Sequence, residues 1–266
     1  MDFNLKNTFI NELPGDQETD NTRRQVDEAC YSFVNPTKTE SPELVHYSKE
    51  VAEFLGLSES DCQSAGFLKT FTGNEIIENS KPYAMCYGGH QFGHWAGQLG
   101  DGRAINIAEL EVDGQNLIFQ LKGSGPTPYS RRADGFAVLR SSIREYLCSE
   151  AMHHLGVPTT RVLSLVKTGD WITRDVLYNG NPKDELGAIV CRVSSSFIRF
   201  GSFEIFAFRG EKKQLKQLVD YTIKNHFSVL GEPSKPIYLA FFKEVVNRTK
   251  DLMIHWQRVG FVHGVM

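Results

Sequence analysis

Lys122 and Glu145 are the residues whose types and spacing point most directly to chemistry. Residues 117–122 predict a strand, in which successive side chains point to opposite faces. One face carries Leu117, Phe119 and Leu121, and the less apolar face carries Ile118, Gln120 and, at the end of the strand, Lys122. Apolar residues at three- and four-residue steps predict a helix over 139–155 with Glu145 beside its apolar stripe. That stripe consists of Leu139, Ile143, Tyr146, Leu147, Ala151 and Leu155. An ammonium braced by a carboxylate can hold phosphate, whereas the alternative is two unrelated surface charges, the usual state of Lys and Glu.

Six glycines between residues 87 and 103 predict a loop without regular structure. The backbone N–H groups of such a loop can approach phosphates closely, but the spacing differs from Gly-x-Gly-x-x-Gly, and Asp101 would repel an anion if it pointed inward. His90 and His94 have the spacing of two metal ligands on one helical turn. Because the glycines disfavour a helix, we expect hydrogen-bonding loop histidines instead of metal ligands.

Three further charged residues are candidates for a binding site. Asp134 and Gly135 follow an Arg-Arg pair just before the predicted helix, and taken alone they are equally consistent with a turn and a helix cap. Arg192 and Arg199 are seven residues apart, so they share a face only if the chain between them is helical or looped. On these grounds alone the two arginines are as consistent with a solvated surface.

Composition limits the class of protein. A chain of 266 residues that is 41% hydrophobic can form one large or two small domains. A formal net charge of −3 gives no global field that attracts nucleic acid or an anionic membrane, so phosphate binding must be local. The five cysteines never have Cys-x-x-Cys spacing, and the sequence has neither a signal peptide pattern nor an apolar run of about 18 residues. We therefore expect a cytoplasmic protein.

The other segments supply the elements that would position these residues. We expect an extended polar arm over 1–40, a helix that Pro42 begins and Gly56 ends, and a short helix over 59–70. The dipeptide at 113–114, Asp-Gly, is a strong hairpin signal. The later predictions are strands over 104–112 and 116–122, three strands within 159–193 with a surface turn at 179–182, and helices with core-packing stripes over 202–209, 211–229 and 235–258.

Several long motifs closely resemble the selenoprotein O family. They are Tyr-Gly-Gly-His-Gln-Phe-Gly-His-Trp-Ala-Gly-Gln-Leu-Gly-Asp-Gly-Arg-Ala (87–104), Leu-Lys-Gly-Ser-Gly-Pro-Thr-Pro-Tyr-Ser-Arg-Arg-Ala-Asp-Gly (121–135), Val-Leu-Arg-Ser-Ser-Ile-Arg-Glu-Tyr-Leu (138–147), Ser-Glu-Ala-Met (149–152), Gly-Val-Pro-Thr-Thr-Arg (156–161) and His-Gly-Val-Met (263–266). The resemblance extends over roughly residues 8 to 266. Members of this family have a protein-kinase-like fold and move AMP from ATP to protein hydroxyls.

The resemblance implies an α+β, protein-kinase-like two-lobed fold. An N-terminal arm with helices would occupy 1–86. A small lobe with an antiparallel sheet, one key helix and the nucleotide site would occupy 87–200. The start of a helical large lobe, truncated at the catalytic loop, would occupy 201–266.

The resemblance also implies a site. Lys122 and Glu145 would be catalytic, and Arg192 and Arg199 would grip the terminal phosphate of an inverted ATP. The implied ATP-binding set is Gly100, Gly102, Arg103, Lys122, Asp134, Gly135, Arg192 and Arg199. The partners would be ATP and acceptor proteins modified on Ser, Thr or Tyr, with no nucleic acid and no membrane. Mg²⁺ or Mn²⁺ is expected in the complete protein, with the metal ligands and the general base beyond Met266.

We therefore expect the sequence to encode part of a protein adenylyltransferase, with this chain an incomplete and inactive fragment. Two alternatives stay open. One is a noncatalytic ATP-binding pseudokinase or scaffold, and the other is a phosphotransferase that uses the same pocket.

Overall fold

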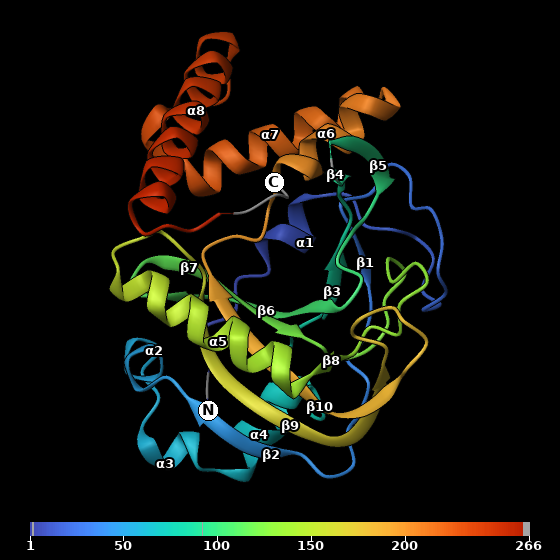
Figure 1. Cartoon of the computed structure of the whole chain (residues 1–266). Helices are drawn as coiled ribbons and strands as arrows, with labels where there is room; N and C mark the ends of the chain where they lie inside the picture. The colour runs from blue at the N-terminus through green and yellow to red at the C-terminus, as the bar shows by residue number, and fades with distance from the viewer. Residues whose placement is uncertain (2, 92, 263–266) are drawn as a thin grey trace.

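A computed structural model describes residues 1, 3–91 and 93–262 (Figure 1). The fold is mixed α+β and is built around one large antiparallel sheet, as expected. The sheet order is β1-β3-β6-β7-β10-β9-β2, β8 pairs with β10, and β4 and β5 form a separate hairpin. The strands are β1 (Tyr31–Phe33), β2 (Glu43–Tyr47), β3 (Tyr83–Met85), β4 (Gly88–Gln91), β5 (His94–Gln98), β6 (Ala104–Val112), β7 (Gln115–Lys122), β8 (Ala137–Val138), β9 (Arg161–Arg174) and β10 (Lys183–Ser194).

Helices lie at two ends of this sheet and along it. Figure 1 shows α6, α7 and α8 gathered at one end of the molecule and α2, α3 and α4 at the other. Between them α5 contacts β9 and β10. The helices are α1 (Thr8–Glu12), α2 (Lys49–Phe54), α3 (Glu59–Cys62), α4 (Ala65–Thr72), α5 (Leu139–His154), α6 (Phe200–Arg209), α7 (Lys212–His226), the 3₁₀ turn η1 (Ser228–Leu230) and α8 (Lys235–Arg258). Within the described residues, we find no helix with the length and apolar character that a bilayer crossing requires.

The β6–β7 hairpin confirms the prediction made from its turn. Asp113 and Gly114 both have positive φ, 49° and 76°, as a two-residue primed turn requires. Strand β7 then runs through the middle of the sheet between β6 and β10. Its Phe119 is fully buried, and the Phe119 ring centroid lies 5.4 Å from that of Phe71 on α4. The core therefore fixes the strand that carries Lys122.

The helix predicted from Pro42 to Gly56 is wrong in its first half. Residues 43–47 form β2 instead, which pairs with the outer edge of β9. Helix α2 begins only after Ser48, whose side chain accepts a hydrogen bond from the Val51 backbone N–H, and the chain leaves the helix at Gly56 with φ +72°. The helix predicted over 59–70 is present as two short helices, α3 and α4, each with a serine cap.

The expectation of a loop without regular structure over 87–103 is also wrong. Residues 88–91 and 94–98 instead form the two strands of the β4–β5 hairpin. The glycines permit it, because a Cβ at Gly88 would lie 2.3 Å from the Trp95 ring and Gly93 has φ +80° near the turn. Small residues thus let an aromatic ring pack on the hairpin.

Two predictions from apolar spacing fail in their details. The three strands expected within 159–193 are two long ones, β9 and β10, joined by the predicted turn with Gly180 at φ +81°. The helices over the last third are present, but the stripe of α8 is not core, since Phe242 is 65% exposed and α8 has no buried residue. The same holds for most of α5, where Tyr146 is buried but Leu147 is 61% exposed. Periodicity marks an apolar face but does not show what covers it.

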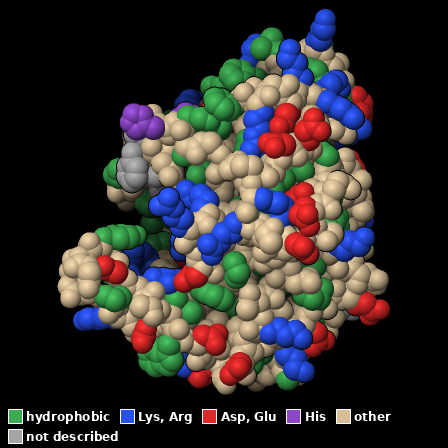
Figure 2. Space-filling model, turned by 90° about the vertical axis from the view of Figure 1, so that its right-hand side faces the viewer, with side chains coloured by type: hydrophobic (Ala, Val, Ile, Leu, Met, Phe, Trp, Pro, Cys, Tyr) green, Lys and Arg blue, Asp and Glu red, His purple; other side chains and the backbone are tan. Residues whose placement is uncertain are grey.

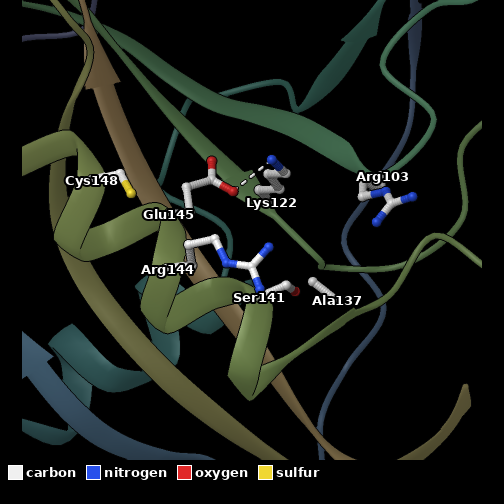
Figure 3. A pocket seen from close by; sticks show the side chains of 7 residues that line it. All are labelled: Arg103, Lys122, Ala137, Ser141, Arg144, Glu145 and Cys148. Carbon is white, nitrogen blue, oxygen red and sulfur yellow. Dashed lines mark ion pairs between the residues drawn. The ribbon is translucent and has the colours of Figure 1, made fainter. Parts of the chain in front are cut away.

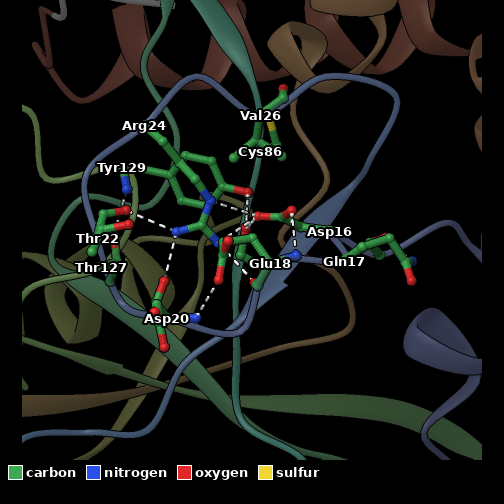
Figure 4. A network of polar contacts seen from close by, with 12 residues as sticks. Asp16, Gln17, Glu18, Asp20, Thr22, Arg24, Val26, Cys86, Thr127 and Tyr129 are labelled. Atoms are coloured by element: carbon green, nitrogen blue, oxygen red, sulfur yellow. Dashed lines mark hydrogen bonds and ion pairs between the residues drawn. The ribbon is translucent and has the colours of Figure 1, made fainter.

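The N-terminal arm is mostly irregular, as expected, and one arginine organises it (Figure 4). The Arg24 guanidinium donates to the Asp16 carboxylate at 2.6 and 3.1 Å and to three backbone carbonyls between residues 18 and 22. Asp16 also accepts from the Ser32 hydroxyl, which lies 2.9 Å from the Tyr129 hydroxyl. The arm is therefore tied to Tyr129, the ring that packs under Gly100.

Candidate functional site

Lys122 and Glu145 form the ion pair that the sequence suggested. Lys122 ends β7, Glu145 lies in the second turn of α5, and the Lys122 Nζ to Glu145 Oε2 distance is 2.5 Å (Figure 3). Both side chains are partly shielded, at 31% and 21% exposure. Burial lowers the pKa of Lys122, and the Glu145 carboxylate opposes that shift. The carboxylate thus helps to keep the ammonium charged.

A cavity of about 280 Å³ opens beside this pair. Arg103 lines it from the position just before the sheet strand β6, while α5 contributes Arg144, Glu145 and Cys148 (Figure 3). Within the described residues Arg103 has no ion-pair partner, so its donors are free for an anion. Figure 2 shows Lys and Arg side chains gathered around a hollow in one face of the molecule.

Arg192 joins the pair from the next strand. It lies on β10 in register with Gln120 of β7. Its guanidinium contacts Glu145 Oε1 at 3.4 Å through Nη1, donates from Nη2 to the Gln120 side-chain carbonyl, and lies 5.2 Å from the Phe197 ring centre. Burial lowers the pKa of Arg192, which Glu145 opposes. One carboxylate therefore holds two cations.

Arg199 reaches the same group of residues from the start of α6. Its Nη2 lies 3.7 Å from Asp101 Oδ1, and its guanidinium lies 4.9 Å from the centre of the Tyr87 ring. It is 41% exposed and lines a second, larger hollow of about 1800 Å³ together with Gly100 and residues of α6, α7 and α8. The four predicted side chains are thus connected by contacts, but they do not share one cavity: Lys122 and Glu145 line the smaller hollow, Arg199 lines the larger one, and Arg192 lines neither.

Gly100 and Gly102 shape the loop beside these cations. A Cβ at Gly100 would lie 2.3 Å from the Tyr129 ring, and one at Gly102 would lie 2.7 Å from the Tyr129 carbonyl oxygen. Gly100 also has φ +67°. The Ser130 hydroxyl donates to the Gly102 carbonyl, which ties the two loops together. Both positions require glycine for close packing and, at Gly100, for backbone conformation.

Asp134 and Gly135 do not line either hollow. Asp134 pairs with Arg174 of β9, with nitrogen–oxygen distances of 2.7 and 2.9 Å, and accepts from the Phe136 backbone N–H. Burial alone would raise the pKa of Asp134, but these hydrogen bonds lower it. Gly135 has φ +81°, and a Cβ there would lie 2.2 Å from the Gly125 backbone. The geometry gives both residues a role in loop packing, and their predicted contact with ATP stays a prediction.

His90 and His94 lie on the strands β4 and β5 of the hairpin, and not in a loop as expected. His90 lies on β4, and its Nδ1 is 3.4 Å from Glu204 Oε1 on α6, so it contacts a carboxylate. In the described part of the chain, one group could bring three metal ligands together: Glu50, His153 and His154. Arg161 already lies 3.2 Å from the Glu50 carboxylate there, which places a positive charge beside that group. The motif at 263–266 lies outside the described residues.

Sequence reasoning missed two buried polar residues between the cations. Gln120 and Asp101 are 0% and 3% exposed, and they connect Arg192 with Arg199. Asp101 was considered only as a charge that would repel an anion. A polar residue in the middle of an apolar strand was the available signal for Gln120, because such a group needs a partner when buried.

Comparison with known protein families identifies the family of this chain. A family model described as protein adenylyltransferase SelO matches residues 17–266. The chain belongs to this family. Among curated members, a protein nucleotidyltransferase YdiU of Flavobacterium johnsoniae is 60% identical over 98% of the chain and 50% of its own length. Those of Azoarcus sp. and Rhodopirellula baltica are 58% and 55% identical, over 98% and 100% of the chain and 50% of their own lengths. The chain therefore spans about half the length of these SelO relatives.

Proposed function

We propose that this chain carries the ATP-binding part of a protein adenylyltransferase, which transfers AMP from ATP to hydroxyl groups of acceptor proteins. In this proposal residues 87–200 form the nucleotide-binding small lobe of a kinase-like fold, and residues 201–266 begin a helical large lobe. The observation that supports it best is the chain of contacts from Lys122 through Glu145 and Arg192 to the region of Arg199.

The charges of this group suit a polyphosphate. Lys122, Arg103, Arg192 and Arg199 bring four positive charges, and Glu145 and Asp101 bring two negative ones. The net charge of these side chains is positive, so an anion such as triphosphate is the ligand that fits. With Arg192 and Arg199 on the terminal phosphate and Lys122 near the α-phosphate, an acceptor hydroxyl would attack the α-phosphorus and release pyrophosphate.

The described carboxylates near the cations do not provide a divalent metal site. Glu145, Asp101 and Asp134 each contact at least one guanidinium or ammonium group. A Mg²⁺ or Mn²⁺ ion that accompanies ATP would therefore be held by the phosphates and by groups other than these three.

Nucleotide binding is tested with a fluorescent ATP analogue in the presence of Mg²⁺ or Mn²⁺. We expect Lys122→Ala to weaken binding at least tenfold. Lys167→Ala is the matched control, since Lys167 is 29% exposed and pairs with Glu43 at 2.8 Å, close to the values for Lys122. Equal binding by the two variants and the unchanged chain would contradict the proposed site.

A second candidate function is ATP binding without transfer by this chain. The paired state of Glu145, Asp101 and Asp134 favours it, because none of the three is free to act as a general base. ATP should then raise the melting temperature while α-labelled ATP leaves no label on an acceptor protein. Robust metal-dependent labelling from the α-position would instead support transfer by the chain itself, and labelling from the γ-position would indicate a phosphotransferase.

A further inference from the structure

A buried polar contact links the two arginines of the site. Gln120 lies on β7 in register with Asn106 of β6 and Arg192 of β10, and it is fully buried. Its side-chain carbonyl accepts from Arg192, and its amide nitrogen donates to Asn106 Oδ1 at 2.8 Å and to Asp101 Oδ2 at 3.4 Å. Asp101 in turn faces Arg199 at 3.7 Å. We call Gln120 and Asp101 the bridge.

The chemistry of the bridge fits only one orientation of the amide. A guanidinium has donors and no acceptor, so the Gln120 carbonyl must face Arg192. A carboxylate accepts, so the Gln120 amide nitrogen must face Asp101. A Glu at 120 would set two carboxylates against each other, and an apolar residue would leave the buried atoms of Arg192 and Asp101 without this partner.

Hydrogen bonds to neighbouring segments fix the position of the Asp101 carboxylate. The Asp101 side chain accepts a hydrogen bond from the Met85 backbone N–H at 3.2 Å, and the Asp101 backbone carbonyl accepts one from the Thr127 hydroxyl at 2.8 Å. Gly100 and Gly102, on either side, allow the close approach to Tyr129 described above. The Asp101 carboxylate is therefore buried beside the Arg199 guanidinium and does not line the smaller cavity next to Lys122.

Both arginines depend on the bridge for their orientation. Arg192 has contacts through Nη1 to Glu145 and through Nη2 to Gln120, while its buried Nε has no hydrogen-bond partner in the described residues. Arg199 has one ion pair in the same part of the chain, with Asp101, and it is partly exposed. Without the bridge, Arg192 would keep its contacts with Glu145 and the Phe197 ring, and Arg199 would keep only its contact with the Tyr87 ring.

We propose that Asp101 and Gln120 are positioning residues that hold Arg192 and Arg199 as one unit for the terminal phosphate of ATP. This inference rests on the proposed function. It predicts that losing the bridge weakens binding of ATP more than binding of ADP, because ADP lacks the phosphate that the arginines would hold. If Asp101 served only to neutralise Arg199, its loss would increase positive charge and tighten ATP binding instead.

The experiment measures ATP and ADP affinity by calorimetry for the whole chain with Mg²⁺. Asp101→Asn, which keeps shape but removes charge, should weaken ATP at least fivefold and change ADP by less than twofold. Gln120→Leu should act in the same direction. Glu109→Gln is the matched control, because Glu109 on β6 is an equally buried carboxylate that instead accepts from Thr8 and the Phe9 backbone. It should lower the melting temperature without changing the ATP to ADP ratio.

A double variant separates positioning from general loosening of the fold. If Asp101 acts through Arg199 and, by way of Gln120, through Arg192, adding Asp101→Asn to Arg199→Ala should weaken ATP binding by clearly less than the product of the two single effects, whereas independent effects would multiply. Tighter ATP binding, an unchanged ratio in Asp101→Asn, or multiplied effects in the double variant would overturn the bridge. If Lys122→Ala and Arg199→Ala both bind ATP normally, the proposed function fails as well. If they bind weakly while Asp101→Asn binds normally, only the bridge fails.

Discussion

Glu145→Gln should destabilise the chain because it leaves two shielded cations without their carboxylate. At an effective dielectric constant of about 20, unit charges 2.5 Å apart attract by roughly 7 kcal/mol, and the desolvation of both ions offsets most of this. Lys122 and Glu145 are 31% and 21% exposed, so the pair lies between a surface pair, worth about 0–1 kcal/mol, and a buried pair, whose disruption costs about 3–5 kcal/mol. We expect a loss of about 1–3 kcal/mol.

The test is a double-mutant cycle with Lys122→Met, Glu145→Gln and both together, followed by denaturant unfolding at pH 7. The coupling free energy between Lys122 and Glu145 should be about 1–2 kcal/mol. Lys167→Met with Glu43→Gln is the control pair, because Glu43 is 68% exposed and the coupling there should stay below about 0.5 kcal/mol. Equal coupling in the two cycles would refute the argument that shielding sets the strength of the site pair.

Three further predictions concern other parts of the molecule. Burial lowers the pKa of His226 to about 4 from 6.5, so between these values the unfolded chain binds more protons than the folded one. Stability is then complete above pH 6.5 and falls by up to about 3 kcal/mol as the pH drops to 4, and denaturant unfolding of His226→Gln should show a flatter profile. Gly135→Ala should lower the free energy of unfolding by more than about 2 kcal/mol, whereas Gly180→Ala, at the same φ of +81° but with no atom within 4 Å, should cost about 1 kcal/mol in the same measurement. Cys148 is the exposed cysteine and lines the cavity. Mass spectrometry after maleimide treatment should therefore find Cys148 modified before the other cysteines, and ATP should slow this modification. Labelling of the Cys148→Ser variant to the same extent as the unchanged chain would contradict this prediction.

Local rules in the sequence were enough for the elements that carry the ion pair. Asp113 and Gly114 favour positive φ, so the hairpin and the end of β7 followed from two residues. The three-to-four-residue spacing after Val138 was enough for α5 and for the turn that holds Glu145. The family motifs were long enough to identify the relationship that the comparison confirmed.

Other features depended on partners that are distant in sequence. Residues 43–47 form a strand because the edge of β9, more than 110 residues later, is available to pair with them. The apolar stripe of α5 does not predict which of its residues are covered: Tyr146 and Ser142 are buried but Leu147 is exposed, because the contact with β9 and β10 follows only part of the stripe. Asp134 was expected at ATP, and only the fold revealed Arg174 beside it.

The sequence by itself determined which residues could hold phosphate, where the main hairpin and helices form, and to which family the chain belongs, because these depend on residue type and short spacing. Only the tertiary structure decided that Asp101 points inward and that Gln120 lies between two arginines. The physical reason is that strand register brings residues 106, 120 and 192 side by side, and burial then requires each polar atom there to find a partner.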